Sequence, residues 1–147
     1  LYGPAYKGIT LSASTAIALA GFNRNVPFAF NRKEVKDHGE GGLTIGAPVS
    51  GKVLIVDDVI SAGTSVRESI EVIEATGASP CGIVISLDRQ ERGTGAESAI
   101  QQIQRDFGLP VINLFCLDDL VEYLSQKPEM ADNLSRVCKY REEYGAA

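Results

Sequence analysis

A chain of 147 residues, 44% of them apolar and 22% charged, has the size and composition of one globular domain. The formal net charge of −5 argues against a general nucleic-acid binder, and no apolar run reaches the length of a membrane-spanning helix. The cysteines are far apart and form no metal-ligand pattern, so we expect buried or half-buried free thiols in a cytoplasmic protein: Cys81, Cys116 and Cys138.

The first predicted elements surround a lysine between two glycines. Residues 1–4 have the character of a strand end, and residues 3–8 form a turn that leads into a helix predicted over residues 10–20. Lys7 at a helix start is a candidate ligand for an anion, and a solvated surface lysine is an equally good interpretation. The expected buried stripe of the helix is Ile9, Ala13, Ile17 and Ala20.

A strand predicted over residues 26–31 precedes a segment of different composition. Residues 32–42 contain one apolar residue, many charges and three glycines, so they should form an exposed, mobile loop. Such a loop is usually only a solvated face, but we favour a lid that closes over a polyanion. Its cations and the only histidine of the chain are Arg32, Lys33, Lys36 and His38.

After another extended segment, over residues 43–49, the chain reaches its organising stretch. Residues 53–56 are four apolar residues in a row, which predicts a strand buried on both faces of a parallel sheet. A helix should follow, because Ser65 and Glu68 have the spacing of a capping box and apolar residues repeat at helical intervals. The buried face of this helix should contain Val66, Ile70 and Ile73, and Gly77 should end it.

The loop between this strand and helix is a predicted phosphate site. Small residues at a helix N-terminus direct several backbone N–H groups to one spot, and the helix dipole favours an anion there. Asp57 and Asp58 would accept hydrogen bonds from hydroxyls of a sugar that carries the phosphate. Two interpretations stay open: a signalling receiver domain with Mg²⁺ on its acids, and a plain capped turn. The sequence lacks the Gly-Lys-Ser/Thr of a Walker loop.

Strands and helices alternate in the rest of the chain. A strand over residues 82–87 puts Arg89 at the carboxyl edge of the sheet, where it could reach a substrate anion or form an ordinary salt bridge. A helix over residues 97–107, a strand over 111–115 and helices over 118–124 and 128–144 complete the pattern. The predicted fold class is α/β, with a mainly parallel central sheet flanked by helices.

These segments resemble the type I phosphoribosyltransferases. Residues 56–65 are similar to the motif that binds 5-phosphoribosyl 1-pyrophosphate (PRPP). Residues 3–8, 30–42 and 85–92 are similar to segments that mark the orotate phosphoribosyltransferase branch, as are residues 127–131 and 140–143. The resemblance implies the type I fold with a flexible catalytic loop, in one core domain over residues 1–147. It also implies that the N-terminal base-hood segment of the family is absent, so we expect weak PRPP binding and slow turnover.

The resemblance implies transfer of 5-phosphoribose from PRPP to orotate, giving orotidine 5′-monophosphate and pyrophosphate in UMP biosynthesis. Mg²⁺ is implied as a cofactor held mainly through PRPP and water, without a protein metal site. A homodimer is implied, in which each loop serves the neighbouring subunit's active site. Two alternatives stay open: a phosphoribosyltransferase for another base, and a non-catalytic, PRPP-sensing regulator that binds nucleic acid, against which the acidic charge and the retained lid both speak.

The resemblance also implies roles for individual residues. Lys36 is the leading catalytic candidate, accompanied by His38, Asp57 and Asp58, and the two aspartates hold the ribose hydroxyls. Ser61 and Arg89 face orotate. The implied PRPP-binding residues are Tyr6, Lys7, Arg32, Lys33, Lys36, His38, Asp57, Asp58, Val59, Ile60, Ser61, Ala62, Gly63, Thr64 and Ser65.

Overall fold

A mainly parallel sheet forms the centre of the molecule. The computed structural model describes residues 1–32, 44–93 and 97–146, and within them six strands pair in the order β3-β2-β1-β4-β5-β6. Neighbouring strands run parallel, except that β2 and β3 are antiparallel. The strands are β1 (Tyr2–Gly3), β2 (Ala29–Asn31), β3 (Thr44–Gly46), β4 (Lys52–Asp57), β5 (Ser79–Asp88) and β6 (Val111–Cys116). The predicted α/β class is confirmed.

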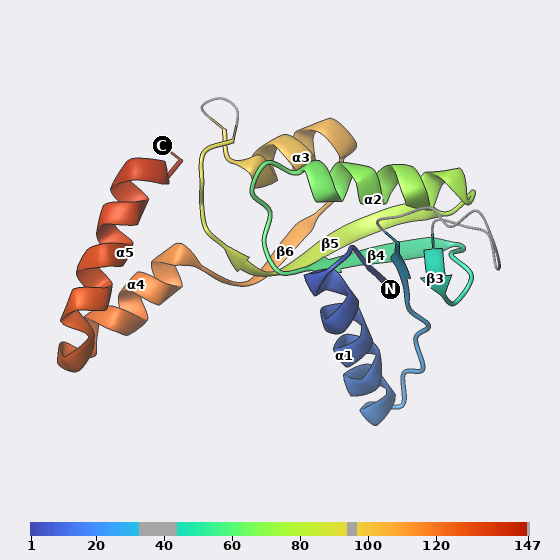
Figure 1. The fold of residues 1–147 in the computed structure, drawn as a ribbon, viewed down its shortest axis with the longest axis horizontal. Helices are drawn as coiled ribbons and strands as arrows, with labels where there is room; N and C mark the ends of the chain where they lie inside the picture. Colours follow the sequence, from blue (N-terminus) through green and yellow to red (C-terminus); the bar gives the residue numbers. More distant parts are fainter. Residues whose placement is uncertain (33–43, 94–96, 147) are drawn as a thin grey trace.

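Helices cover both faces of the sheet (Figure 1). Helices α2 and α3 lie on one face and α1 lies on the other, while α4 and α5 form a pair beyond β6. This division follows from right-handed crossover connections. The chain moves from β1 toward one edge of the sheet to reach β2, and from β4 toward the other edge to reach β5 and β6, so the connecting helices lie on opposite faces. The helices are α1 (Lys7–Gly21), α2 (Thr64–Ala75), α3 (Ala99–Phe107), α4 (Leu117–Ser125), the 3-10 helix η1 (Pro128–Met130) and α5 (Ala131–Tyr144).

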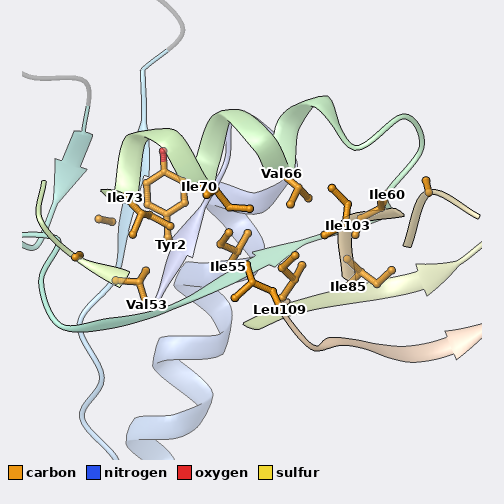
Figure 2. Close-up of a cluster of buried hydrophobic side chains, with 14 residues drawn as sticks. Tyr2, Val53, Ile55, Ile60, Val66, Ile70, Ile73, Ile85, Ile103 and Leu109 are labelled. Atoms are coloured by element: carbon orange, nitrogen blue, oxygen red, sulfur yellow. The ribbon is translucent and has the colours of Figure 1, made fainter. Parts of the chain in front are cut away.

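The main hydrophobic core lies between the sheet and helices α2 and α3. Figure 2 shows Val66, Ile70 and Ile73 of α2 directed toward the strands, where Ile55 belongs to the same buried cluster. Burying one such side chain stabilises the fold by roughly 1.5–3 kcal/mol. The predicted buried strand and the predicted apolar face of α2 are therefore confirmed.

Helix α1 packs on the sheet through small residues and not through the predicted apolar stripe. Its buried residues are Gly8 and Ser12. A Cβ atom on Gly8 would lie 2.6 Å from Pro4 Cδ and 2.8 Å from the carbonyl oxygen of Val56, so the helix backbone touches the sheet. The predicted stripe is therefore not the buried face: Ile9 and Ala13 are half-buried, Ala20 is exposed and Ile17 is 75% exposed.

Helix α2 begins differently from the prediction. Its N-cap is Gly63, which has a left-handed backbone with φ of 76° and offers no side-chain cap. Ser65 lies inside the first turn, where its hydroxyl donates to Asp57 Oδ2 at 3.4 Å. The predicted capping box of Ser65 and Glu68 is therefore wrong. The predicted stop is confirmed, since Gly77 has a φ of 81° and its N–H donates to the Glu74 carbonyl.

Strand β6 is the edge strand beside β5 and carries exposed apolar side chains, including Leu114 at 73% exposure. Cys81 on β5 is also exposed, which corrects the expectation of a buried thiol, whereas Cys116 and Cys138 are half-buried as expected. Within the described ranges, none of the helices is long and apolar enough to cross a bilayer.

The end of the chain returns to the segment that follows β5. Glu91 and Gly145 form an antiparallel bridge. The Arg92 N–H donates to the Tyr144 carbonyl at 2.9 Å, and the Ala146 N–H donates to the Gln90 carbonyl at 2.8 Å. Residues at the end of α5 therefore hold the segment that includes Arg89.

Candidate active site

The carboxyl ends of the parallel strands β1 and β4 meet at one edge of the sheet, beside the N-terminus of α2. A cavity of about 390 Å³ lies there, and the segments that follow both strands form its wall. Its lining residues are Ala5, Tyr6, Lys7, Asp57, Asp58, Val59, Ile60, Ser61, Ala62, Gly63, Thr64, Ser65 and Val66. The structure thus brings together the predicted phosphate loop, the two predicted acids and the predicted lysine turn.

Asp57 ends strand β4 and is 7% exposed. Burial raises the pKa of this carboxyl to about 6, and the neighbouring charge of Asp58 adds to the rise. Two hydrogen bonds oppose it: the Asp58 N–H donates to Asp57 Oδ1 at 2.9 Å, and the Ser65 hydroxyl donates to Oδ2. Asp57 is therefore a carboxylate that takes up a proton in mildly acidic solution.

The pKa of Asp58 is shifted in the opposite direction. Partial burial alone would raise its pKa, but the hydrogen bond and the charge of Lys7 outweigh that effect and lower it. Lys7 Nζ lies 2.5 Å from Asp58 Oδ2, and the lysine side chain is 74% exposed. An exposed ion pair contributes about 1 kcal/mol or less, so Lys7 can leave Asp58 for an anionic ligand at little cost.

The first turn of α2 forms the part of the cavity that the sequence predicts to bind an anion. The first N–H groups of a helix lack intrahelical acceptors, and Gly63, Thr64, Ser65 and Val66 line the cavity at this point. The left-handed backbone of Gly63 favours glycine, and a Cβ atom there would lie 3.0 Å from Ile103 Cδ1. The backbone at the helix start therefore requires glycine at position 63.

Arg32 lies apart from this cavity. It lines a neighbouring cavity of about 610 Å³ together with Asn31, Glu68 and Glu71, while Thr64 and Ser65 border both cavities. Asn31 links the two regions, because its Oδ1 accepts a hydrogen bond of 2.7 Å from the Ala5 N–H. Lys33, Lys36 and His38, the other predicted cations of the loop, lie outside the described residues.

Arg89 approaches the site from the segment after β5. Its Nη2 donates to Ser61 Oγ at 2.6 Å and lies 3.0 Å from Glu91 Oε2. Its Nε is buried, and the described residues offer it no acceptor. The two residues that the family resemblance assigns to the base, Ser61 and Arg89, are therefore in contact.

Known proteins with similar sequences and structures share one family. The phosphoribosyl transferase domain family matches residues 1–104. The orotate phosphoribosyltransferase of Laribacter hongkongensis is 62% identical over 145 residues, which are 99% of this chain and 68% of that protein. The chain belongs to the orotate phosphoribosyltransferase family.

Further relatives agree with this assignment. The orotate phosphoribosyltransferase of Thiobacillus denitrificans is 59% identical over 145 residues, again 99% of this chain and 68% of that protein. The crystal structure of orotate phosphoribosyltransferase from Francisella tularensis has a TM-score of 0.78 and 36% identity, covering 98% of this chain and 69% of that chain. The resemblance found in the sequence, and with it the type I fold, is confirmed.

Some residues of this orotate phosphoribosyltransferase site escaped the sequence analysis. Ala5 and Val66 line the cavity, and both are direct chain neighbours of predicted residues. Glu91 pairs with Arg89, and only its place two residues further along the chain hinted at this role. Within the described residues, no three His, Cys, Asp or Glu side chains are grouped closely enough to hold a metal ion.

Proposed function

We propose that this chain transfers 5-phosphoribose from PRPP to orotate, forming orotidine 5′-monophosphate and pyrophosphate in UMP biosynthesis. The supporting observation is the single cavity that joins Lys7, two aspartates and the N-terminus of α2, with Arg89 at its Ser61 edge. In this cavity, backbone N–H groups could bind a phosphate, the two carboxylates could accept from ribose hydroxyls, and Lys7 could bind a diphosphate. The 62% identity with an orotate phosphoribosyltransferase supports orotate as the acceptor.

In this proposal the 5′-phosphate binds at residues 61–65, where N–H groups and hydroxyls surround it. Asp57 and Asp58 accept hydrogen bonds from the ribose hydroxyls. Lys7 exchanges Asp58 for the diphosphate, and Tyr6 lies on the same side of the cavity. Breaking the ion pair between Lys7 and Asp58 requires little free energy because the lysine side chain is largely exposed.

Transfer of phosphoribose requires cations near the leaving pyrophosphate and exclusion of water from ribose C1. As the bond from ribose C1 to pyrophosphate breaks, negative charge grows on the leaving group and positive charge on C1. We assign neutralisation of the leaving group to Lys7 and to the loop residues Arg32, Lys33, Lys36 and His38, with Lys36 foremost. Closure of the loop would keep water from capturing the sugar. A cytoplasmic homodimer, in which the loop serves the partner's site, completes the proposal.

Mg²⁺ suits the donor set of this cavity. Two carboxylates beside a phosphate site, without a third protein ligand among the described residues, match an ion that prefers substrate phosphates and water. When bound, the ion would neutralise part of the charge of the diphosphate. Asp57 and Asp58 are the residues that would orient its ligands.

A base panel tests the proposed function. We expect pyrophosphate release from PRPP with orotate, and little release with uracil, hypoxanthine or adenine. Turnover with one of the other bases would identify a different phosphoribosyltransferase. PRPP binding without turnover of any of these bases would favour the non-catalytic regulator.

Replacing Arg89 by Ala tests how the base is recognised. The planar guanidinium suits the carboxylate of orotate, and a hydrogen bond to a charged group contributes about 1.5–3 kcal/mol. We therefore expect the KM for orotate to rise roughly 10- to 100-fold, with the KM for PRPP nearly unchanged. Steady-state kinetics with each substrate varied in turn measures both values. An equal rise in the two KM values would contradict this role.

A further inference from the structure

We propose that Gln90 is a positioning residue for Arg89, and that Asp118 and Arg141 hold Gln90 in place. The inference rests on the proposed function, in which Arg89 recognises the base. It assigns the task of orienting the base-recognising side chain to the α4–α5 pair, which lies beyond β6 (Figure 1) and contributes no residue to the lining of the cavity.

The backbone of Gln90 requires a restraint. Gln90 has a φ of 53°, in the left-handed region that residues with a side chain rarely occupy. An L-residue in this conformation is strained by roughly 1–2 kcal/mol. Because Gln90 directly follows Arg89, we expect a change of its backbone conformation to alter the direction of the arginine side chain.

The restraint comes from hydrogen bonds that use all four polar groups of Gln90. Its N–H donates to Asp88 Oδ1 at 2.8 Å, and its carbonyl accepts from the Ala146 N–H at 2.8 Å. Its side-chain Nε2 donates to Asp118 Oδ2 at 3.0 Å, and its Oε1 accepts from the Asp118 N–H at 3.1 Å. The carboxamide is thus bound at both ends by one residue at the start of α4.

Asp118 is itself oriented by α5. Its other oxygen, Oδ1, lies 2.9 Å from Arg141 Nη1, so the two carboxylate oxygens serve two different partners. Both side chains of this ion pair are substantially exposed, and its own contribution to stability is therefore small. The ion pair instead orients the Asp118 carboxylate so that Oδ2 accepts the hydrogen bond from Gln90.

The restraint on Gln90 affects the position of Arg89 in the candidate active site. With residue 90 fixed, the Arg89 guanidinium contacts both Ser61 Oγ and Glu91 Oε2. Released from Asp118, residue 90 can return to an ordinary backbone conformation, and Arg89 then loses a defined direction. Orotate recognition should weaken. PRPP binding should change much less, because Lys7, the two aspartates and residues 62–65 line the cavity without contact from Arg89.

The experiment compares two substitutions at Gln90. Gln90→Ala removes the carboxamide and disfavours the left-handed backbone, whereas Gln90→Gly removes the carboxamide and tolerates that backbone. If the side-chain restraint positions Arg89, both variants should raise the KM for orotate roughly tenfold, the equivalent of one hydrogen bond of about 1.4 kcal/mol. The KM for PRPP should change less than about twofold.

A second pair of variants tests the partner. Asp118→Ala removes the acceptor of Gln90 Nε2 but keeps the backbone N–H that donates to Oε1, so it should raise the KM for orotate by less than Gln90→Ala does. Asp118→Asn keeps one oxygen for Gln90 Nε2 but loses the charge that faces Arg141, so its KM should lie between those of Asp118→Ala and the unmodified chain. Gln126→Ala and Asp132→Ala are the matched controls, because both residues are exposed on the same α4–α5 pair. Neither control should change either KM.

Several results would overturn the proposal. Unchanged KM for orotate in Gln90→Ala, or equal rises for both substrates, would show that Gln90 serves only the fold. Should the unmodified chain fail to use orotate, the proposed function fails, and the positioning claim is then decided by the crystal structure of Gln90→Ala. Loss of the contact between Arg89 and Ser61 in that structure supports the claim, and its retention refutes it.

Discussion

Gly3→Ala is expected to destabilise the protein by about 3 kcal/mol or more. A Cβ atom on Gly3 would collide with the Gly8 carbonyl oxygen and Ser12 Oγ, and would lie 2.5 Å from the Gly8 carbonyl carbon. Two of these atoms belong to the backbone of α1, so no rotamer change relieves the collision. The helix would have to move off the sheet, carrying Lys7 away from Asp58.

Thermal unfolding measures this effect, and we expect Tm to fall by roughly 10 °C for a domain of this size. Gly21→Ala is the matched control, because Gly21 ends the same helix and a Cβ atom there meets nothing within 4 Å. That control should leave Tm unchanged or raise it slightly. A Gly3→Ala variant as stable as the control would show that α1 does not touch the sheet as described.

Asp57→Asn is expected to stabilise the fold at neutral pH and to abolish most of the activity. The pKa of Asp57 in the folded protein is raised to about 6, above its ordinary value of 3.8. The native state therefore binds the proton more tightly than the unfolded chain, and the free energy of unfolding decreases as pH rises from about 4 to 6. Above this window the buried charge costs about 3 kcal/mol, which the neutral amide avoids.

Urea unfolding of both proteins at several pH values checks the stability difference. The variant should be more stable by about 3 kcal/mol at pH 7.5, and the difference should shrink to less than about 1 kcal/mol at pH 4. A constant difference across this range would mean that Asp57 does not titrate as described.

The same substitution should lower kcat/KM for PRPP by roughly 10²-fold or more. The charged oxygens of Asp57 are proposed to hold ribose hydroxyls beside a carbon that becomes positive, and an amide lacks that charge. In the unmodified protein, kcat/KM should fall below about pH 6 as Asp57 is protonated. Steady-state kinetics over this pH range, with the variant measured in parallel, separates the protein's titration from that of PRPP.

Local sequence patterns were sufficient to predict most of the fold and the residues that line the cavity beside α2. The apolar run before Asp57 and the hydroxyl-rich loop after Asp58 depend on neighbours in the chain, so their spacing predicts them. The same reasoning failed at α1, because hydrophobic periodicity points to Ile17 and gives no weight to a glycine that touches a strand. It failed at Ser65 because Gly63 adopts a left-handed cap that a spacing rule does not consider.

The part of the site that is proposed to recognise the base depends on contacts that spacing cannot reveal. Gln90 and Asp118 are 28 residues apart in the chain and meet only because α4 begins beside the end of β5. Neither residue type is unusual, and neither belongs to a run with a period. Only the folded structure, with Gln90 in a left-handed conformation, draws attention to the pair.

The order of residues along the chain also sets the order in which the two parts of the candidate site can form during synthesis. Residues 5–7 and 57–66 line the cavity with the predicted phosphate loop, whereas the segment of Arg89 is secured by Arg141, Tyr144 and Ala146. Synthesis proceeds from the N-terminus, so the phosphate cavity can form while the ribosome is still adding helices. The segment of Arg89 gains its contacts only after residues 141–146 have been synthesised.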